Sequence, residues 1–384
     1  MEKKKVLLVA TVQSHICQFH LPLIDLLHEK GYEVHVAAKN NLKEKRGLKL
    51  ERADKVFEVP FERSPFKKQN ITAYKMLKKI INENHYNIIH CNTPMGGVLS
   101  RLAGKKERKQ GTKIIYTAHG FHFFKGAPLK NWMIYYPIEK YLSKYTDCII
   151  TMNQEDYKIA SKKFKKTNVE YTHGVGVRTE KFNISLNNKE KEDLRKKLNL
   201  KSEDFVIIYV AEMTKRKNHI MLLKCMKELI KEKQNIKLLL AGNGPLQQEY
   251  KEWIQDNNLK NNIQLLGYRP DIPQLMQISD IGVSTSKQEG LPVNVMEMML
   301  SNLPIIVTNC RGNNDLIKDN KNGYVVEIDD IISLKEKILK LYSDKELCKT
   351  MGKQAKIEVQ PYLLENVIKE INEIYIKVVN KNEK

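Results

Sequence analysis

The chain has 384 residues, which is too long for one ordinary hydrophobic core and predicts two domains of roughly 150 to 200 residues each. A hydrophobic share of 41%, with 17 Tyr and 10 Phe, excludes disorder over most of the length. The formal net charge of +21 indicates an anionic partner, although a general lysine bias would also explain it. Only 10 of the 66 basic residues are Arg, on which sequence-reading nucleic-acid binders rely, so no nucleic-acid partner is expected.

The positive charge is concentrated in the first half of the chain. Residues 1–182 hold 34 basic and 17 acidic side chains, a net of +17, whereas residues 183–384 hold 32 and 28, a net of +4. The six cysteines show no Cys-x-x-Cys spacing, which predicts a reducing cytoplasm rather than a disulfide scaffold or a structural zinc site. The apolar runs fall short of the roughly 20 residues that cross a bilayer, so any membrane attachment is expected to be peripheral.

Short apolar runs alternate with helical patterns from the start of the chain. The first run is residues 6–10, and residues 21–27 then carry Leu and Ile at helical spacing before Gly31. Further strands are expected at residues 33–38, 55–59, 88–91, 113–117 and 148–151. Continuous apolar strands separated by helices predict a parallel sheet covered on both faces.

A second series of strands follows a charged stretch, residues 187–204, which predicts a linker and one solvated helix. The strands are expected at residues 205–210, 236–241, 263–265, 281–284, 304–308 and 323–326. The chain closes with an amphipathic helix in residues 361–384, expected to pack back on the first domain. The prediction is an α/β protein with two Rossmann-like parallel-sheet domains, residues 1–182 and 183–360. Ligands bind beyond the carboxyl ends of parallel strands, so the domains are expected to face each other across a cleft holding the active site.

The most informative segment runs from Glu289 to Glu297, directly after a predicted strand. Pro292 suits the first turn of a helix, which places Glu289 at the mouth of that helix and Glu297 about one and a half turns inside. Free backbone N–H groups at a helix start attract phosphate, which predicts a diphosphate site. The residues of this helix start are Gly290, Leu291, Pro292, Val293 and Asn294. A carboxylate on either side would hold the hydroxyls of a sugar and of a ribose, with solvated surface charge as the alternative.

Together with residues 304–308 and 322–326, this segment resembles the donor-binding half of the GT-B-fold retaining glycosyltransferases of family 4. The resemblance extends over nearly the whole chain and implies a nucleotide-sugar donor, a UDP-sugar in our interpretation. It assigns Glu289 to hydroxyls of the donor sugar and Glu297 to the ribose. It also implies a glycan acceptor such as those of bacterial capsule or exopolysaccharide assembly, often linked to polyprenyl diphosphate.

Residues 210–218 follow the first strand of the second domain, where the family has an Arg and a Lys that grip the diphosphate. Lys217 matches that Lys, and its charge would stabilise the departing nucleoside diphosphate. Glu212 stands where the Arg is expected. Because an acid beside a diphosphate is unfavourable, Glu212 is expected to orient Lys217 or a hydroxyl, while Lys215 or Arg216 supplies the missing charge. An exposed turn is the alternative for this basic trio.

Two other stretches of the second domain resemble nucleotide contacts. Gly242 and Gly244 end a strand and would allow close approach of the backbone to the nucleotide, although an ordinary turn explains them equally well. The absence of a third glycine disfavours a dehydrogenase. Tyr268 and Arg269 occupy the family's base-contacting stretch and would stack on uracil, with an exposed loop as the alternative.

In the first domain, His119 follows a predicted strand and matches the family's active-site His, which hydrogen-bonds the donor sugar near the reacting carbon. His122 lies three positions further on, but a third ligand of suitable spacing is not evident. The chain also lacks an Asp-x-Asp motif, with which other glycosyltransferases hold a divalent cation. We therefore expect neither a metal nor a cofactor, and Lys217 with the helix start would neutralise the diphosphate.

Acceptor contacts are expected where two strands of the first domain end. Ser14 and His15 lie where the family has a flexible loop, often with two glycines, and the lack of glycine here predicts a stiffer loop. Thr93 and Gly96 follow the strand at residues 88–91 and would border the acceptor. A helix start that serves only the fold explains them equally well.

Basic clusters at residues 105–109 and 162–166, and the mixed basic and aromatic residues 61–68, all lie in the first domain. Such clusters suit an anionic leaflet, at about 1 kcal/mol per basic residue near the surface. We expect a cytoplasmic protein bound peripherally to the inner face of the membrane that carries its acceptor. Two alternatives stay open: a UDP-sugar epimerase of the same fold, and a non-catalytic basic protein that binds membrane or nucleic acid.

Overall fold

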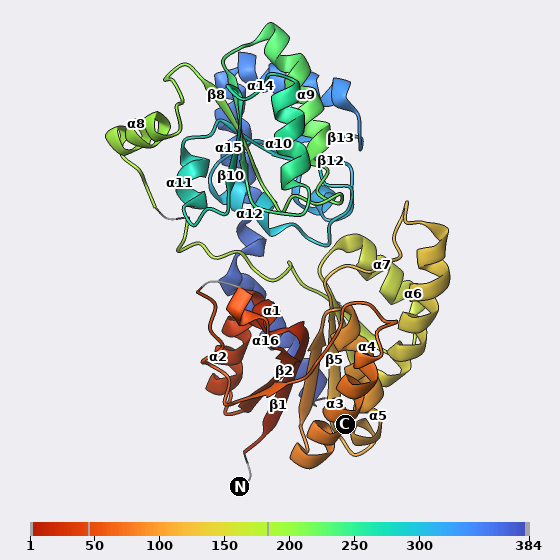
Figure 1. Ribbon diagram of the computed structural model, residues 1–384. Coiled ribbons are helices and arrows are strands. Elements are labelled where there is room, and N and C mark those ends of the chain that lie inside the picture. Colours follow the sequence, from red (N-terminus) through yellow and green to blue (C-terminus); the bar gives the residue numbers. More distant parts are fainter. Residues whose placement is uncertain (1–2, 45–46, 183, 381–384) are drawn as a thin grey trace. The chain divides into compact units, whose positions relative to one another are not determined.

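The computed structural model describes residues 3–44, 47–182 and 184–380. The chain forms two compact units, each built around one parallel sheet (Figure 1). Unit 1 comprises Met1–Gly176 and Glu365–Lys384, and unit 2 comprises Val177–Leu364. The division falls slightly before the boundary that we expected after Phe182, and the C-terminal segment belongs to unit 1.

Unit 1 contains a seven-stranded sheet in the order β3-β2-β1-β4-β5-β6-β7, with every adjacent pair parallel. The strands are β1 (Lys5–Val12), β2 (Glu33–Lys39), β3 (Lys55–Glu58), β4 (Ile88–Asn92), β5 (Lys113–Ala118), β6 (Cys148–Thr151) and β7 (Asn168–Tyr171). The first six confirm the predicted strands. The sequence did not indicate β7, because its four residues are only half-buried and form no apolar run.

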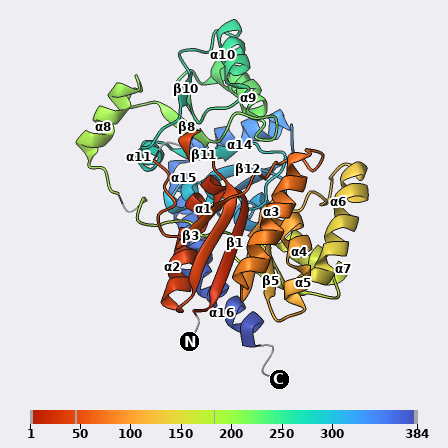
Figure 2. The same cartoon turned by 60° about the horizontal axis from the view of Figure 1, so that its bottom comes forward.

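Helices cover both faces of this sheet, which is why its central strands are apolar on both sides (Figure 2). The helices are α1 (Gln13–Phe19), α2 (Leu21–Glu29), α3 (Gln69–Asn84), α4 (Pro94–Ala103), α5 (Lys105–Arg108), α6 (Leu129–Leu142), α7 (Gln154–Lys163) and α16 (Leu364–Asn380). Leu7 and Val9 of β1 belong to the core shared with α3, α4 and α7, whereas Leu8 and Ala10 belong to the core shared with α1, α2 and α16.

The C-terminal helix α16 is an integral part of unit 1. Its Ile374, Tyr375 and Val378 are buried in the core next to β1 and β2. The Tyr375 hydroxyl also lies 2.7 Å from Nδ1 of the buried His90, in the middle of β4. The amphipathic pattern predicted this helix, and the structure shows what its apolar stripe covers. Among the described residues, no helix is long and apolar enough to span a membrane.

Unit 2 contains a six-stranded sheet in the order β10-β9-β8-β11-β12-β13, again with parallel pairs. The strands are β8 (Phe205–Val210), β9 (Ile236–Ala241), β10 (Ile263–Gly267), β11 (Ile281–Ser284), β12 (Ile305–Thr308) and β13 (Gly323–Val326). The helices are α8 (Asn188–Lys197), α9 (His219–Glu232), α10 (Gln247–Asp256), α11 (Ile272–Gln277), α12 (Val293–Leu300), α13 (Asn313–Leu316), α14 (Ile331–Ser343) and α15 (Lys345–Glu358). The strands confirm the prediction, and α8 has no buried residue, as expected of a solvated helix.

Both sheets reverse their strand order beside the first strand of the unit. The reversal lies between β1 and β4 in unit 1 and between β8 and β11 in unit 2. At such a switch point the connecting helices leave toward opposite faces, which opens a crevice at the carboxyl ends of the strands. His15, Thr93, Lys217 and Glu289, which the sequence singled out, lie after these four strands.

Candidate functional site

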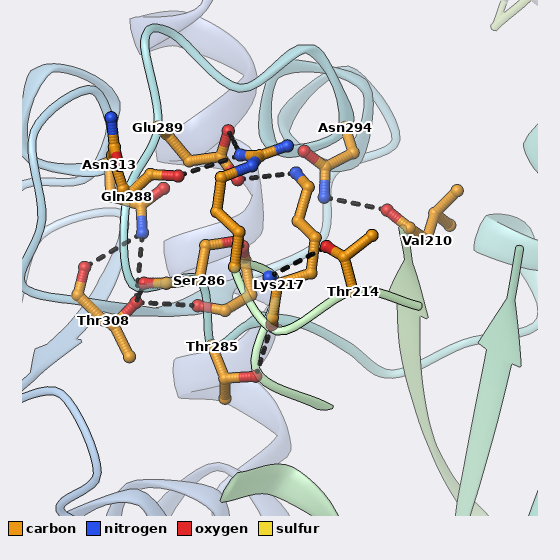
Figure 3. Close-up of polar contacts among 12 residues, drawn as sticks. Val210, Thr214, Lys217, Thr285, Ser286, Gln288, Glu289, Asn294, Thr308 and Asn313 are labelled. Carbon is orange, nitrogen blue, oxygen red and sulfur yellow. Dashed lines mark hydrogen bonds and ion pairs between the residues drawn. The ribbon is translucent and has the colours of Figure 1, made fainter. Parts of the chain in front are cut away.

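The switch point of unit 2 brings together the two loops that carried the strongest sequence signals. β8 ends at Val210 and leads into the loop with Lys217, while β11 ends at Ser284 and leads through Glu289 into α12. The Asn294 side chain, in the first turn of α12, donates a 2.9 Å hydrogen bond to the Val210 carbonyl and ties the helix start to the end of β8 (Figure 3). The two loops thus form one polar edge.

The centre of this edge is an ion-pair cluster around Glu289 (Figure 3). Oε1 of Glu289 lies 2.6 Å from Nζ of Lys217, and Oε2 lies 2.8 Å from Nη1 of Arg216. Glu289 and Lys217 are 6% and 8% exposed, so their pair is buried, whereas the Arg216 side chain is 47% exposed. Two cations facing one carboxylate leave the cluster with an excess positive charge.

The protonation state of Glu289 follows from this pairing. Desolvation by burial would raise the pKa of its carboxyl, but the charges of Lys217 and Arg216 outweigh desolvation and leave the pKa below the ordinary value. Glu289 is therefore an anion at neutral pH. A buried carboxylate held by two cations can accept hydrogen bonds from neutral hydroxyls while the cations attract an anionic group beside it.

Several buried residues that the sequence analysis missed hold the cluster in place. The Tyr209 hydroxyl donates to the Lys217 carbonyl at 2.8 Å and lies 3.1 Å from Ser286 Oγ. Nε of Arg311 donates to the Glu289 carbonyl at 3.0 Å, which places a third cation next to the loop. Ser286 also accepts a hydrogen bond from Thr308 through its carbonyl (Figure 3). They carried no sequence signal because their partners lie in the loops after β8 and β11, between 8 and 77 positions away in the chain.

The start of α12 differs by one residue from the expectation. Pro292 has extended backbone angles and caps the helix, so the first helical residue is Val293 and our placement of Pro292 in the first turn was wrong by one position. Glu297, one turn further on, is partly buried. Burial raises the pKa of its carboxyl to about 7, against a smaller opposing effect of the Lys181 charge. Glu297 therefore changes its protonation state near neutral pH.

The structure contradicts one of the two expected roles of Glu212, the orientation of Lys217, whereas the orientation of a hydroxyl stays a prediction. The Glu212 side chain is exposed, and the carboxylate that holds Lys217 is Glu289. Glu212 lies only two residues after the end of β8, whereas the turn of the following loop directs Lys217 toward the β11 loop. Of the two residues expected to add a positive charge here, Arg216 contacts Glu289. Lys215 is exposed.

The two glycines after β9 are explained by packing within unit 2. A Cβ atom on Gly242 would lie 2.1 Å from the Ala211 carbonyl oxygen, and one on Gly244 would lie 2.5 Å from backbone atoms of Met213. The backbone that approaches them closely is thus the β8 exit. Tyr268 is 73% exposed, and the Arg269 guanidinium is held by both carboxylate oxygens of Asp271. Tyr268 is therefore the freer of the two to meet a planar ring.

At the carboxyl edge of the unit 1 sheet, His119 meets two histidines from the β1 exit. Nε2 of His15 lies 3.3 Å from Nε2 of His119 and 3.3 Å from Nε2 of His20. Asn92, at the end of β4, places Oδ1 at 3.2 Å from His119 Nε2. Desolvation by burial lowers the pKa of His15 to about 4 and the pKa values of His20 and His119 well below the ordinary value. The three imidazoles are therefore neutral at pH 7.

The structure groups His119 with His15 and His20 and leaves His122 apart. The His122 ring stacks on Tyr135 of α6 with a centroid distance of 4.6 Å. Sequence spacing did not indicate a third ligand near His119, because His15 and His20 lie about a hundred positions away in the chain. Only the parallel pairing of β1, β4 and β5 brings them together.

The acceptor-side candidates lie at the same edge but mostly serve the fold. β1 passes directly from Val12 into α1, so the expected loop at Ser14 and His15 is a helix. Ser14 Oγ accepts a 2.9 Å hydrogen bond from Asn41. Gly96 lets α4 approach β1, because an added Cβ would lie 3.3 Å from the Ala10 Cα of β1, as well as 2.9 Å from Thr93 Oγ1. Thr93 itself has a positive φ of 63°, an unusual backbone for a β-branched residue.

Comparison with known proteins defines the class. A family model described as glycosyl transferases group 1 matches residues 190–358, and one described as glycosyl transferase 4-like matches residues 5–153. The EpsD protein of Bacillus subtilis (strain 168), with a provisional glycosyltransferase assignment, is 40% identical over 97% of this chain and 96% of its own. The UDP-Gal:alpha-D-GlcNAc-diphosphoundecaprenol alpha-1,3-galactosyltransferase of Escherichia coli is 32% identical over 82% of this chain and 80% of its own length.

Solved structures show the same architecture. Sucrose-phosphate synthase from Thermosynechococcus elongatus superimposes with a TM-score of 0.78 at 18% identity, covering 98% of this chain and 99% of that one. Anabaena Alr3699/HepE, in complex with UDP and glucose, gives a TM-score of 0.76 at 19% identity, covering 97% and 100%. The chain therefore belongs to the GT-B-fold glycosyltransferases of the family 4 type, and the predicted fold class is confirmed.

Proposed function

We propose that the chain is a retaining glycosyltransferase that moves a hexose or N-acetylhexosamine from a UDP-sugar to a glycan precursor linked to polyprenyl diphosphate. The observation that carries the proposal is the buried carboxylate of Glu289 between Lys217 and Arg216, beside the start of α12. This arrangement suits a ligand that has neutral hydroxyls next to a diphosphate. The process we assign to it is assembly of cell-surface polysaccharide.

The donor site of unit 2 can divide its work between charge and hydrogen bonding. Lys217, Arg216 and the backbone N–H groups at the start of α12 would neutralise the diphosphate without a metal ion. The Glu289 carboxylate would accept hydrogen bonds from the sugar hydroxyls, and the Glu297 carboxylate from the ribose. Tyr268, with its exposed ring, would stack on uracil.

In the reaction, the bond between the anomeric carbon and the diphosphate breaks as the acceptor hydroxyl attacks from the same face of the sugar. The leaving phosphate takes the proton of that hydroxyl, and Lys217 stabilises the charge that develops on UDP. We assign His119 to the donor sugar, where its neutral imidazole would support the positive character at the anomeric carbon. This assignment follows the family resemblance.

The proposed acceptor rests on the relatives. The name of the Escherichia coli relative states transfer of galactose from UDP-Gal to GlcNAc-diphosphoundecaprenol, a lipid-linked saccharide. The relative CapM of Staphylococcus aureus, 23% identical over 100% of this chain, is named as a glycosyltransferase of capsular polysaccharide biosynthesis. The first name supports a lipid-linked glycan precursor, and the second supports a part in polysaccharide assembly.

Unit 1 offers a surface that suits such a membrane. The apolar side chains Leu129, Met133, Ile134, Ile138 and Tyr141 of α6 are all exposed, the first two at 74% and 69%. Exposed lysines on and next to the same helix are Lys125, Lys130, Lys140 and Lys144. Apolar side chains bordered by cations match the interface of an anionic leaflet. We therefore propose peripheral attachment of unit 1, with α6 added to the basic clusters that the sequence indicated.

The attachment has a direct test with a matched control. Leu129→Ser combined with Met133→Ser is expected to reduce sedimentation with vesicles that contain anionic lipid, and raised salt is expected to weaken binding of the unchanged protein. Ile332→Ser removes an equally exposed apolar side chain from unit 2 and should bind as the unchanged protein does. Equal binding of the double variant and the unchanged protein would remove α6 from the proposal.

The proposed reaction is tested by offering the protein a panel of UDP-sugars with and without a polyprenyl-diphosphate-linked saccharide. We expect one donor to raise the melting temperature, because a ligand that binds the native state stabilises it, and the same donor to release UDP when the acceptor is added. Formation of an epimer from the donor alone would replace our proposal with an epimerase. Salt-sensitive binding to nucleic acid with no response to any UDP-sugar would indicate a non-catalytic protein.

A further inference from the structure

A cluster of three imidazoles lies at the carboxyl edge of the unit 1 sheet, with their Nε2 atoms directed toward one another. His15 belongs to α1, His20 lies between α1 and α2, and His119 follows β5. Their ligand-type nitrogen atoms all lie within 4.8 Å of one another. His15 Nε2 is the common member, at 3.3 Å from Nε2 of each of the other two.

Hydrogen bonding alone does not account for this arrangement. The Nε2 atom of a neutral imidazole carries either one hydrogen or one lone pair, so His15 Nε2 can form a good hydrogen bond with one of its two partners. His119 Nε2 has the same conflict, because it lies 3.3 Å from His15 Nε2 and 3.2 Å from Asn92 Oδ1. A cation at the centre would satisfy the lone pairs of all three imidazoles at once.

The distances match the coordination of a small transition-metal ion. Tetrahedral zinc with Zn–N bonds of about 2.0 to 2.1 Å separates its ligand atoms by about 3.3 to 3.4 Å. Two of the three distances between the ligand nitrogens of His15, His20 and His119 have this length, and Asn92 Oδ1 lies 3.2 Å from His119 Nε2. Asn92 is fully buried, and among the described residues its Nδ2 has no hydrogen-bond partner. Its amide is thus not fixed by other contacts.

The chemistry of the ligands restricts the ion. Three imidazoles without a carboxylate suit zinc, cobalt or nickel and disfavour magnesium and calcium, which require oxygen ligands. We propose that His15, His20 and His119 form a binding site for a divalent first-row transition-metal ion. Because His119 is also assigned to the donor sugar, an ion bound here inhibits sugar transfer. That consequence, unlike the binding itself, rests on the proposed function.

Binding is tested on the full chain after treatment with a chelator, by titration of Zn²⁺ in competition with a chromophoric chelator. The unchanged protein is expected to bind one equivalent, and Co²⁺ in the same site is expected to show the strong visible absorption of a four-coordinate complex. His15→Gln and His119→Gln should each weaken Zn²⁺ binding by at least about 100-fold. His85→Asn changes an exposed histidine at the C-terminal end of α3 and should leave Zn²⁺ binding unchanged.

His15 and His119 are both half-buried, so the folding of the two Gln variants is checked by circular dichroism before the titration. Unchanged Zn²⁺ affinity in folded His15→Gln and His119→Gln would overturn the site, as would a Co²⁺ complex with the weak spectrum of six-coordination. If Zn²⁺ binds as predicted but leaves sugar transfer unaffected, the inhibition is refuted while the site stands. If the protein transfers no sugar, the titration still decides the metal site by itself.

Discussion

The carboxyl edges of the two sheets carry opposite kinds of polar chemistry. In unit 2, the carboxylate of Glu289 is buried between the cations Lys217 and Arg216. In unit 1, the polar groups around His119 are neutral imidazoles and an amide, with no carboxylate among the contacts of the cluster that the structure gives. The same strand order therefore supports a fixed ionic site in one unit and an uncharged site in the other. The difference predicts that the two edges respond differently to mutation.

The largest effect is expected from breaking the ionic edge with Glu289→Ala. This change leaves the buried Lys217 ammonium without its partner, and the loss of one member of a buried ion pair costs about 3 to 5 kcal/mol of unfolding free energy. Urea denaturation measures this loss. The exposed carboxylate of Glu212 provides the control, because Glu212→Gln should change stability by less than about 0.5 kcal/mol. Equal stability of Glu289→Ala and the unchanged protein would contradict the ionic description.

Removing an imidazole from the uncharged edge is expected to cost less stability. His119→Gln loses hydrogen bonds without leaving a buried charge, so the expected cost is about 1 kcal/mol. Acceptor-dependent UDP release should nevertheless fall strongly, since we assign His119 to the donor sugar. Denaturation and UDP release measured on the same preparation separate the two effects. A stability loss as large as that of Glu289→Ala would show that the two edges are alike.

A third prediction concerns the protonation of Glu297, in the helix that follows Glu289. Its pKa of about 7 means that the carboxyl is protonated at pH 6 and ionised at pH 8, and only the ionised form offers both oxygens as acceptors to the ribose. UDP affinity should therefore rise about tenfold between pH 6 and pH 8, relative to Glu297→Gln. Isothermal titration calorimetry of both proteins measures it. An identical pH profile for the variant would remove Glu297 from the ribose contact.

The raised pKa of Glu297 also predicts how the folding stability depends on pH. Folding raises the pKa of Glu297 from an ordinary value of 4.5 to about 7, so the native state holds this proton more tightly than the unfolded state does. Stability from this group is present below pH 4.5 and is lost as the pH rises through 7. Glu297→Gln should thus raise the melting temperature more at pH 8 than at pH 5. The reverse order would show that the pKa is not raised.

The smallest effect is expected at the rim of the donor site. Tyr268→Ala removes an exposed ring, so the melting temperature should not change, while UDP affinity should fall by roughly fivefold to tenfold if the ring stacks on uracil. The melting temperature and the UDP affinity are both measured in one thermal titration with UDP. An unaltered UDP affinity would leave the base contact to other residues.

The sequence predicted most of the fold because buried parallel strands are apolar along their whole length. β8 and β9 are examples in which the predicted bounds equal the observed ones. β7 was not predicted, because a short edge strand needs little apolar surface. Glu289 and Lys217 were found because each lies in the loop after a recognisable strand, in a segment that resembles a known family.

The contacts within each site were beyond the reach of sequence patterns. The partner of Lys217 is Glu289, 72 positions away, and the choice of Glu289 over the nearby Glu212 depends on how the loop after β8 turns. In unit 1, His20 and Asn92 had no signal of their own, because only the pairing of β1 with β4 and of β4 with β5 brings them to His119. Such sites are set by tertiary structure, which local spacing does not encode.

The most direct test of the central claim is acceptor-dependent UDP release by the unchanged protein and by Glu289→Gln. The Gln variant keeps the size of the side chain but removes the charge that holds Lys217 and the sugar hydroxyls. We predict release of UDP and a product whose new bond keeps the anomeric configuration of the donor for the unchanged protein, and a loss of at least about 100-fold for a folded Glu289→Gln. Full activity of that variant, or a product with inverted configuration, would contradict the account.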